Sequence, residues 1–183
     1  MSAGDVLRNL QKKQYDHDKK AHQDVLYLPL PDRMAHFALH LAKYTGRLAQ
    51  GDIDEAAVKR AAIDAFVICL AASNALKVPV TDYFDQSEQQ GSIAALGLAL
   101  GRTEKLTKEI VRDWYFRQLA LGSGELAKAC EYLQHLEPAP YRELILDSLA
   151  RVCRASIVML TFLSADVETV VAGRWQEIEE RQR

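Results

Sequence analysis

Residues that interrupt regular structure are scarce in this sequence. Its 183 residues include only five prolines and nine glycines. No Asn-Gly or Asp-Gly pair joins two short alternating apolar segments, which would be the usual signature of a β-hairpin. A fold built from many short strands is therefore excluded, and we expect an all-α protein, a helical bundle.

Signals for export, membrane insertion and metal binding through cysteine are also missing. No run of about 18 apolar residues could span a membrane, and Met1–Leu10 does not form the apolar stretch of a signal peptide. Cys69, Cys130 and Cys153 lie far apart without a CxxC spacing, so we interpret them as reduced thiols in the core. We therefore expect a cytoplasmic protein with no membrane partner.

Charge of one sign is not in excess. The 23 basic and 25 acidic residues give a formal net charge of -2, so no global field draws the protein to nucleic acid, and we expect no nucleic-acid partner. The sequence contains no GxxxxGK[ST], GxSxG or HExxH motif. P-loop, hydrolase-elbow and zincin chemistries are therefore not supported.

What the sequence does contain is apolar periodicity typical of helices. Between Asp32 and Gly51, apolar side chains recur every three or four residues, at Met34, Phe37, Leu41, Tyr44 and Leu48. Similar reasoning predicts further helices over 4–23, from a cap at Asp52 or Asp54 to Leu76, and over 91–101, 103–136, 141–164 and 166–183.

Glycine and proline modify this pattern in two places. Gly122-Ser123-Gly124 predicts a kink or a short break within 103–136. The prolines at 29 and 31 predict that 25–31 is an extended strap. We expect one domain over 1–183, with 1–23 and 166–183 as peripheral helices and the charged tail 177–183 frayed.

The chain resembles itself across its two halves. Residues 41–49 align with 119–127 with five identities, and each segment is followed by a long apolar helix that carries an aspartate, Asp64 or Asp147. We predict two related helix pairs, within 30–101 and 103–165, packed around a pseudo-twofold axis.

Two segments of the first half together resemble a known family. The run 39–48, with 61–68 after a short loop, is similar to the MazG-type all-α nucleotide pyrophosphohydrolases, and the likeness covers about residues 30–80. In that family carboxylates from two helices hold magnesium, which positions a nucleoside triphosphate for attack by water. The resemblance implies a nucleotide ligand and a Mg²⁺ cofactor.

The acidic positions of the family are only partly present. Lys43, Tyr44, Arg47 and Ala61 stand at matching first-half positions, and Asp64 is retained there. In the second half Glu125 stands in a Gly-Glu-Leu triplet, and Glu143 and Asp147 are one helical turn apart. The resemblance therefore implies these candidate metal ligands: Asp64, Glu125, Glu143 and Asp147.

A basic stripe runs along the predicted helix after Asp32. His36, His40, Lys43 and Arg47 repeat at four, three and four residues, which places them on one face opposite the apolar one. Imidazoles that protonate near neutrality and two fixed cations could contact phosphate. The alternative is the ordinary polar face of a surface helix.

Two functional hypotheses follow. The first is a divergent MazG-like protein that binds nucleotides or acts as a Mg²⁺-dependent pyrophosphohydrolase. The second is a non-catalytic helical module that binds a protein partner or a second copy of itself as a dimer.

Overall fold

The computed structural model describes residues 1–51 and 53–181, and every regular element in these ranges is helical. The predicted all-α class is therefore confirmed. The elements are α1 (Ala3–Ala21), α2 (Gln23–Leu26), α3 (Leu30–Leu48), α4 (Glu55–Leu76), the short 3₁₀ helix η1 (Val80–Tyr83), α5 (Ile93–Thr103), α6 (Val111–His135), α7 (Tyr141–Phe162) and α8 (Val167–Arg181).

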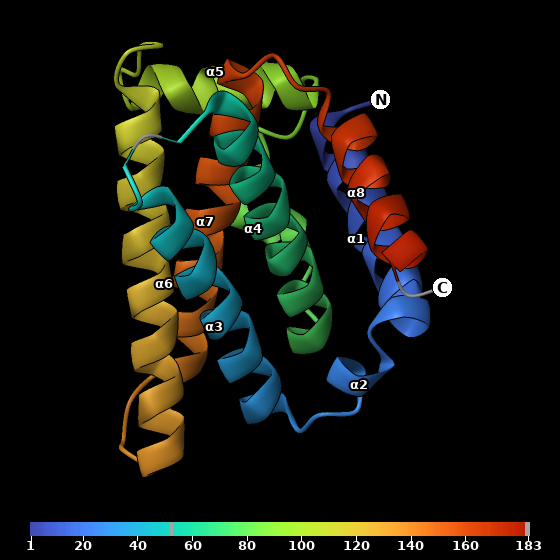
Figure 1. The fold of residues 1–183 in the computed structure, drawn as a ribbon, viewed down its shortest axis with the longest axis vertical. Helices are drawn as coiled ribbons and strands as arrows, with labels where there is room; N and C mark the ends of the chain where they lie inside the picture. Colours follow the sequence, from blue (N-terminus) through green and yellow to red (C-terminus); the bar gives the residue numbers. More distant parts are fainter. Residues whose placement is uncertain (52, 182–183) are drawn as a thin grey trace.

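The centre of the molecule is a bundle of α3, α4, α6 and α7 (Figure 1). Within each half the two long helices pack together, α3 on α4 and α6 on α7. Between the halves α3 packs on α6, and α4 on α7. Each helix thus packs on its counterpart in the other half, α3 on α6 and α4 on α7, as a pseudo-twofold arrangement requires. The sequence duplication itself stays a prediction.

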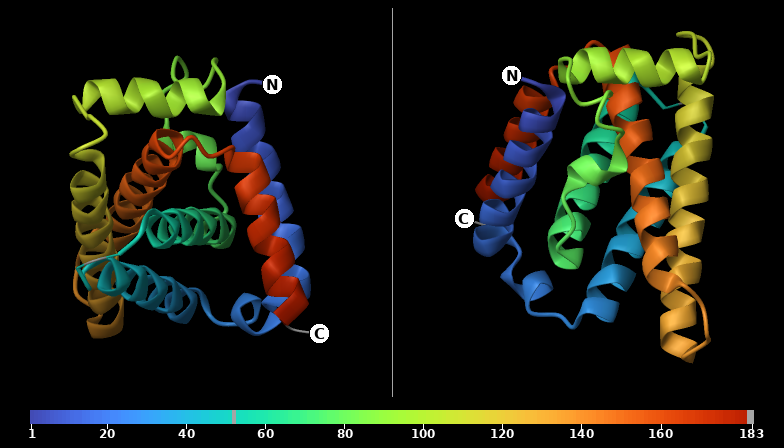
Figure 2. Two further views of the ribbon diagram at one scale, coloured as in Figure 1. Left: turned by 45° about the horizontal axis from the view of Figure 1, so that its top comes forward. Right: turned by 180° about the vertical axis from the view of Figure 1, so that it is seen from behind.

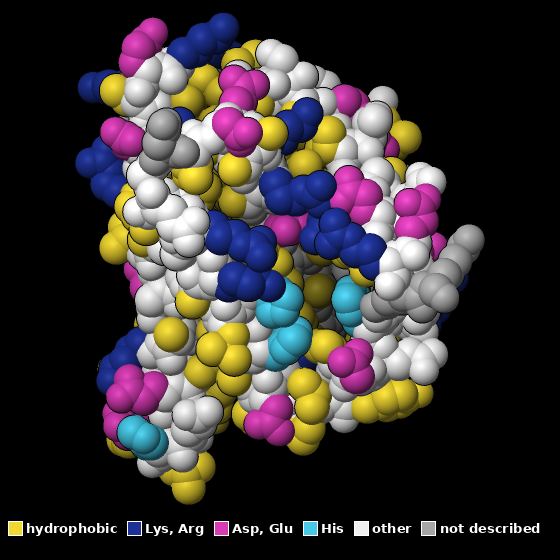
Figure 3. Space-filling view, viewed as in Figure 1, with side chains coloured by type: hydrophobic (Ala, Val, Ile, Leu, Met, Phe, Trp, Pro, Cys, Tyr) yellow, Lys and Arg dark blue, Asp and Glu magenta, His cyan; other side chains and the backbone are white. Residues whose placement is uncertain are grey.

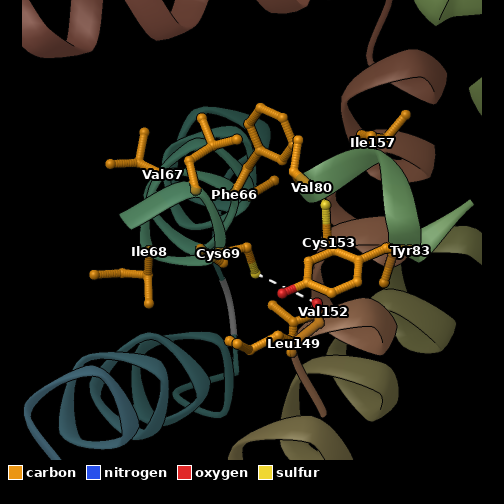
Figure 4. Close-up of a cluster of buried hydrophobic side chains, with 14 of the residues drawn as sticks. Phe66, Val67, Ile68, Cys69, Val80, Tyr83, Leu149, Val152, Cys153 and Ile157 are labelled. Carbon is orange, nitrogen blue, oxygen red and sulfur yellow. Dashed lines mark hydrogen bonds between the residues drawn. The ribbon is translucent and has the colours of Figure 1, made fainter. Parts of the chain in front are cut away.

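A cluster of buried apolar side chains lies where α4 packs on α7 (Figure 4). Phe66 and Leu149 are fully buried there. Cys69 Sγ donates a hydrogen bond of 3.6 Å to the main-chain oxygen of Leu149, and Cys153 is buried nearby. All three cysteines are buried and free of disulfides, in agreement with their interpretation as core thiols.

One predicted boundary is confirmed and two need correction. Asp54 caps α4, its side chain accepting from the Ala57 N–H at 2.7 Å, while Asp52 lies outside the described residues. Helix α3 begins at Leu30, ahead of Asp32, because a proline at the second helical position lacks only an N–H that would be unpaired there. The predicted strap is partly helical, since α2 occupies 23–26.

The remaining helices enclose this bundle on two sides. Figures 1 and 2 show α8 alongside α1 at one edge and α5 across one end. Trp175 of α8 is buried and donates from Nε1 to Gln14 Oε1 of α1 at 2.7 Å. No single helix of the described ranges is long and apolar enough to cross a membrane, although α7 and α8 together, bent by 106°, have the length and composition.

Candidate functional site

A cleft of about 420 Å³ opens between α3, α4 and α8. It is lined by His22, His40, Lys43, Tyr44, Arg47, Arg60, Asp64, Val67, Ile68, Arg174, Ile178 and Arg181. Figure 3 shows the hollow from its open side, with Lys and Arg side chains in dark blue and His side chains in cyan around its mouth. Two consecutive helices, α3 and α4, and the distant α8 thus converge on one basic opening.

Cations outnumber acids in the lining. Five lining residues carry a Lys or Arg charge, and Asp64 is the acid among them. Arg60 and Arg174 both pair with Glu177, a neighbouring acid of α8. Among the described residues, neither Lys43 nor Arg47 forms an ion pair with an acid, so their charges remain available to a ligand.

Lys43 and Arg47 are held by aromatic rings. The Lys43 Nζ lies 5.0 Å and the Arg47 guanidinium carbon 5.9 Å from the centre of the Tyr44 ring. Tyr44 is buried at the contact of α3 with the bundle. Cation–π contact orients both groups through their charge. Lys43 uses one donor toward His40 Nδ1 at 3.3 Å, and the remaining N–H donors of the two groups stay free to bind an anion.

Asp64 fixes the inner wall of the cleft. Its side chain is 5% exposed, and Arg174 donates to it from Nε to Oδ1 at 2.5 Å and from Nη2 to Oδ2 at 3.4 Å. This two-bond geometry matches a planar guanidinium to a carboxylate. Asp64 therefore holds α8 against α4 and positions Arg174, and both of its oxygens are engaged by that arginine.

The histidines of the stripe are not cations at neutral pH. Burial, together with nearby Lys43, lowers the pKa of His40 to about 4, and burial also lowers the pKa of His36. Lys43 Nζ lies 3.3 Å from His40 Nδ1, and because an ammonium only donates, Nδ1 is the acceptor nitrogen. The expectation that these imidazoles protonate near neutrality is therefore wrong, since they are half-buried beside a fixed cation.

The stripe also lies differently on α3 from the predicted position. His40, Lys43 and Arg47 line the cleft, whereas His36 lines an apolar chamber next to it. The stripe borders the buried face of α3, and the exposed face carries Leu39 instead. The reason is that the cleft and the chamber both lie on this side of α3, next to side chains of α4, which periodicity within one helix does not reveal.

The four predicted metal ligands are not brought together. Asp64 faces Arg174, while Glu125 accepts from Arg151 at 3.0 and 3.2 Å on the far helix pair. Glu143 and Asp147 are exposed on α7. Within residues 1–51 and 53–181, no three His, Cys, Asp or Glu side chains are placed to hold one metal ion, and Asp64 and Glu125 are each paired with an arginine instead.

Comparison of the chain with protein-family models, with curated proteins and with solved structures finds no match. The geometry of the cleft therefore carries the functional argument.

Four basic residues of the cleft were not predicted: His22, Arg60, Arg174 and Arg181. Arg60 precedes Asp64 by four residues on α4, and Arg174 precedes Arg181 by seven on α8, spacings that place each pair on one helical face. This signal was present in the sequence. It shows that the side chains share a face, but not that the two faces meet.

Proposed function

We propose that the chain binds a small phosphate-bearing molecule in the cleft between α3, α4 and α8, through its own cationic side chains. The observation that carries the proposal is the convergence of five Lys and Arg residues from three helices on one opening. Guanidinium and ammonium groups form strong, charge-assisted hydrogen bonds with phosphate oxygens. Nucleotides are the phosphate ligands implied by the MazG-type resemblance.

Binding without metal catalysis fits the side chains better than hydrolysis. A magnesium-dependent pyrophosphohydrolase needs several carboxylates converging on the ion. Here the retained aspartate, Asp64, is engaged by Arg174 on both oxygens. A phosphate group would instead be bound by Lys43 and Arg47, which have no acidic partner among the described residues.

Calorimetric titration with inorganic pyrophosphate, in the presence and absence of Mg²⁺, tests this proposal. We expect saturable binding without Mg²⁺, and a Kd raised at least about tenfold in Lys43→Ala/Arg47→Ala, because each lost charged hydrogen bond is worth roughly 1.5–3 kcal/mol. The matched control is Lys13→Ala/Arg117→Ala, which removes the same two residue types from exposed positions outside the cleft.

The control variant should bind pyrophosphate as the native chain does. If both double variants weaken pyrophosphate binding equally, the loss reflects only the lower net charge of the protein, and the proposed site is overturned. Binding that requires Mg²⁺ and disappears in Asp64→Asn would replace it with the metal-dependent mechanism, and no binding of pyrophosphate at all would leave the interaction-module hypothesis.

A further inference from the structure

An apolar chamber adjoins the basic cleft. It measures about 70 Å³ and is lined by Gln14, Asp18, His22, Val25, Leu26, Arg33, His36, Phe37, His40, Val67, Ile68 and Ala71. Four of these residues, His22, His40, Val67 and Ile68, also line the cleft. The two spaces therefore lie next to each other and share these lining residues.

The chamber and the cleft differ sharply in polarity. Aliphatic side chains of α2 and α4 and the Phe37 ring make up most of the chamber wall. His36 and His40 pack their rings together there, with centroids 4.6 Å apart. Both imidazoles are neutral at pH 7, because burial lowers their pKa values. Arg33 is thus the fixed cation of the chamber, whereas the cleft contains several, Lys43 and Arg47 among them.

The chamber contains one charged group of each sign, Arg33 and Asp18. Arg33 is turned to the main chain, where its Nη2 donates to the carbonyl oxygens of Leu26 and Leu28. Asp18 is 6% exposed and accepts from Gln14 Nε2 at 2.7 Å. An anionic group is therefore favoured at the Lys43 end, where cations are in excess, over the chamber, where the charge of Asp18 offsets that of Arg33. This difference sets the direction in which a two-part ligand lies.

We propose that the ligand is an amphiphilic anion, a phosphate carrying an aliphatic group of about four to six carbons, with the phosphate in the cleft and the aliphatic group in the chamber. This inference rests on the proposed phosphate-binding function and specifies its ligand class. The size follows from the chamber, whose 70 Å³ gives room for roughly five atoms the size of a water molecule.

A series of alkyl phosphates tests the proposal by calorimetry on the full chain. From methyl to butyl phosphate we expect affinity to rise by up to about fourfold for each added methylene that enters the chamber. The rise should stop between butyl and octyl phosphate, once the chamber is filled. Adenosine monophosphate, whose phosphate is attached to a polar sugar, should bind no more tightly than methyl phosphate.

Two variants locate the alkyl group. Ala71→Leu from α4 and Val25→Phe from α2 each fill the chamber from a different wall. Either should remove the dependence on chain length while pyrophosphate binding stays unchanged, which also reports that the variant is folded. If one variant fails to fold, the other variant and the alkyl phosphate series on the native chain still test whether the alkyl group binds in the chamber.

The outcomes separate this inference from the function on which it rests. Pyrophosphate binding with equal affinity for all alkyl phosphates would overturn the amphiphilic ligand and leave the phosphate site standing. Tighter binding of adenosine monophosphate than of hexyl phosphate would also overturn it, in favour of a nucleotide. No binding of any phosphate would remove both proposals.

Discussion

At the level of single residues, Arg174 determines both the packing of α8 and the charge of the cleft. Its side chain is 15% exposed and lies between Asp64 of α4 and Glu177 of its own helix. Removing one partner of a buried ion pair strongly destabilises the fold, because the remaining charge is left buried without a partner and without water. An exposed pair has no such penalty.

We expect Asp64→Ala to lower the free energy of unfolding by about 3 kcal/mol, the usual effect of removing one partner of a buried pair. The matched control is Glu125→Ala, which breaks the Glu125–Arg151 pair, whose side chains are 40% and 37% exposed. That change should lower the free energy by less than about 1 kcal/mol. Urea denaturation followed by circular dichroism measures both, and equal losses would contradict a structural role for Asp64.

At the level of elements, small residues set how closely α6 approaches α7. A kink or a short break was predicted at Gly122-Ser123-Gly124, and the break does not occur, because α6 is continuous from Val111 to His135. A Cβ at Gly122 would lie 2.5 Å from Val152 Cγ2 and 3.2 Å from the Ser148 carbonyl oxygen. The Ser148 hydroxyl also donates to the Gly122 carbonyl oxygen at 2.7 Å. This glycine therefore allows the close packing of α6 on α7.

The two glycines of this segment should respond oppositely to alanine. Gly122→Ala should lower the free energy of unfolding by about 1–3 kcal/mol, since the added methyl overpacks the contact with α7. Gly124→Ala meets nothing within 4 Å and should raise it by up to about 1 kcal/mol through helix propensity. Thermal and urea unfolding of both variants provide the measurement, and stabilisation by both would contradict the close contact.

At the level of the whole molecule, the wall that α1 and α3 form around the chamber contains two buried groups with opposite responses to acid. Burial raises the pKa of Asp18 to about 6 and lowers the pKa of His40 to about 4. Between these values the folded chain holds a proton on Asp18 that the unfolded chain releases. The folded chain also excludes from His40 a proton that the unfolded chain binds.

The two effects on stability should therefore oppose each other between about pH 4 and 6.5. As pH falls through this range, Asp18 makes folding more favourable and His40 makes it less favourable. Relative to the native chain, Asp18→Asn should be stabilised at pH 7.5 by on the order of 2 kcal/mol and lose this advantage toward pH 4.

His40→Gln should show the opposite trend, with stability relative to the native chain rising as pH falls. Urea denaturation at pH 4.5, 5.5, 6.5 and 7.5 measures the differences between each variant and the native chain. Parallel pH profiles for all three proteins would contradict the assigned pKa directions.

Local pattern was enough to predict the helical class and most of the helices. The apolar spacing from Met34 to Leu48 predicted α3, and the alanine-rich run after Asp54 predicted α4. Both predictions were possible because the buried face of a helix recurs in the sequence with a period of 3.6 residues. The cysteines were likewise recognised as core residues. Ends near proline were less well predicted, since Pro31 is tolerated within the first turn of α3.

The candidate site depended on information that no single helix carries. The sequence showed that Lys43 and Arg47 share a face, but not that Arg60 and Arg174 lie across from them. It also showed Asp64 as an acid that could have met a metal ion, whereas in the fold this side chain is paired with Arg174, 110 residues away. Periodicity determines which residues of a helix are neighbours, while the partner that an inward charge meets is decided by how helices distant in sequence pack together.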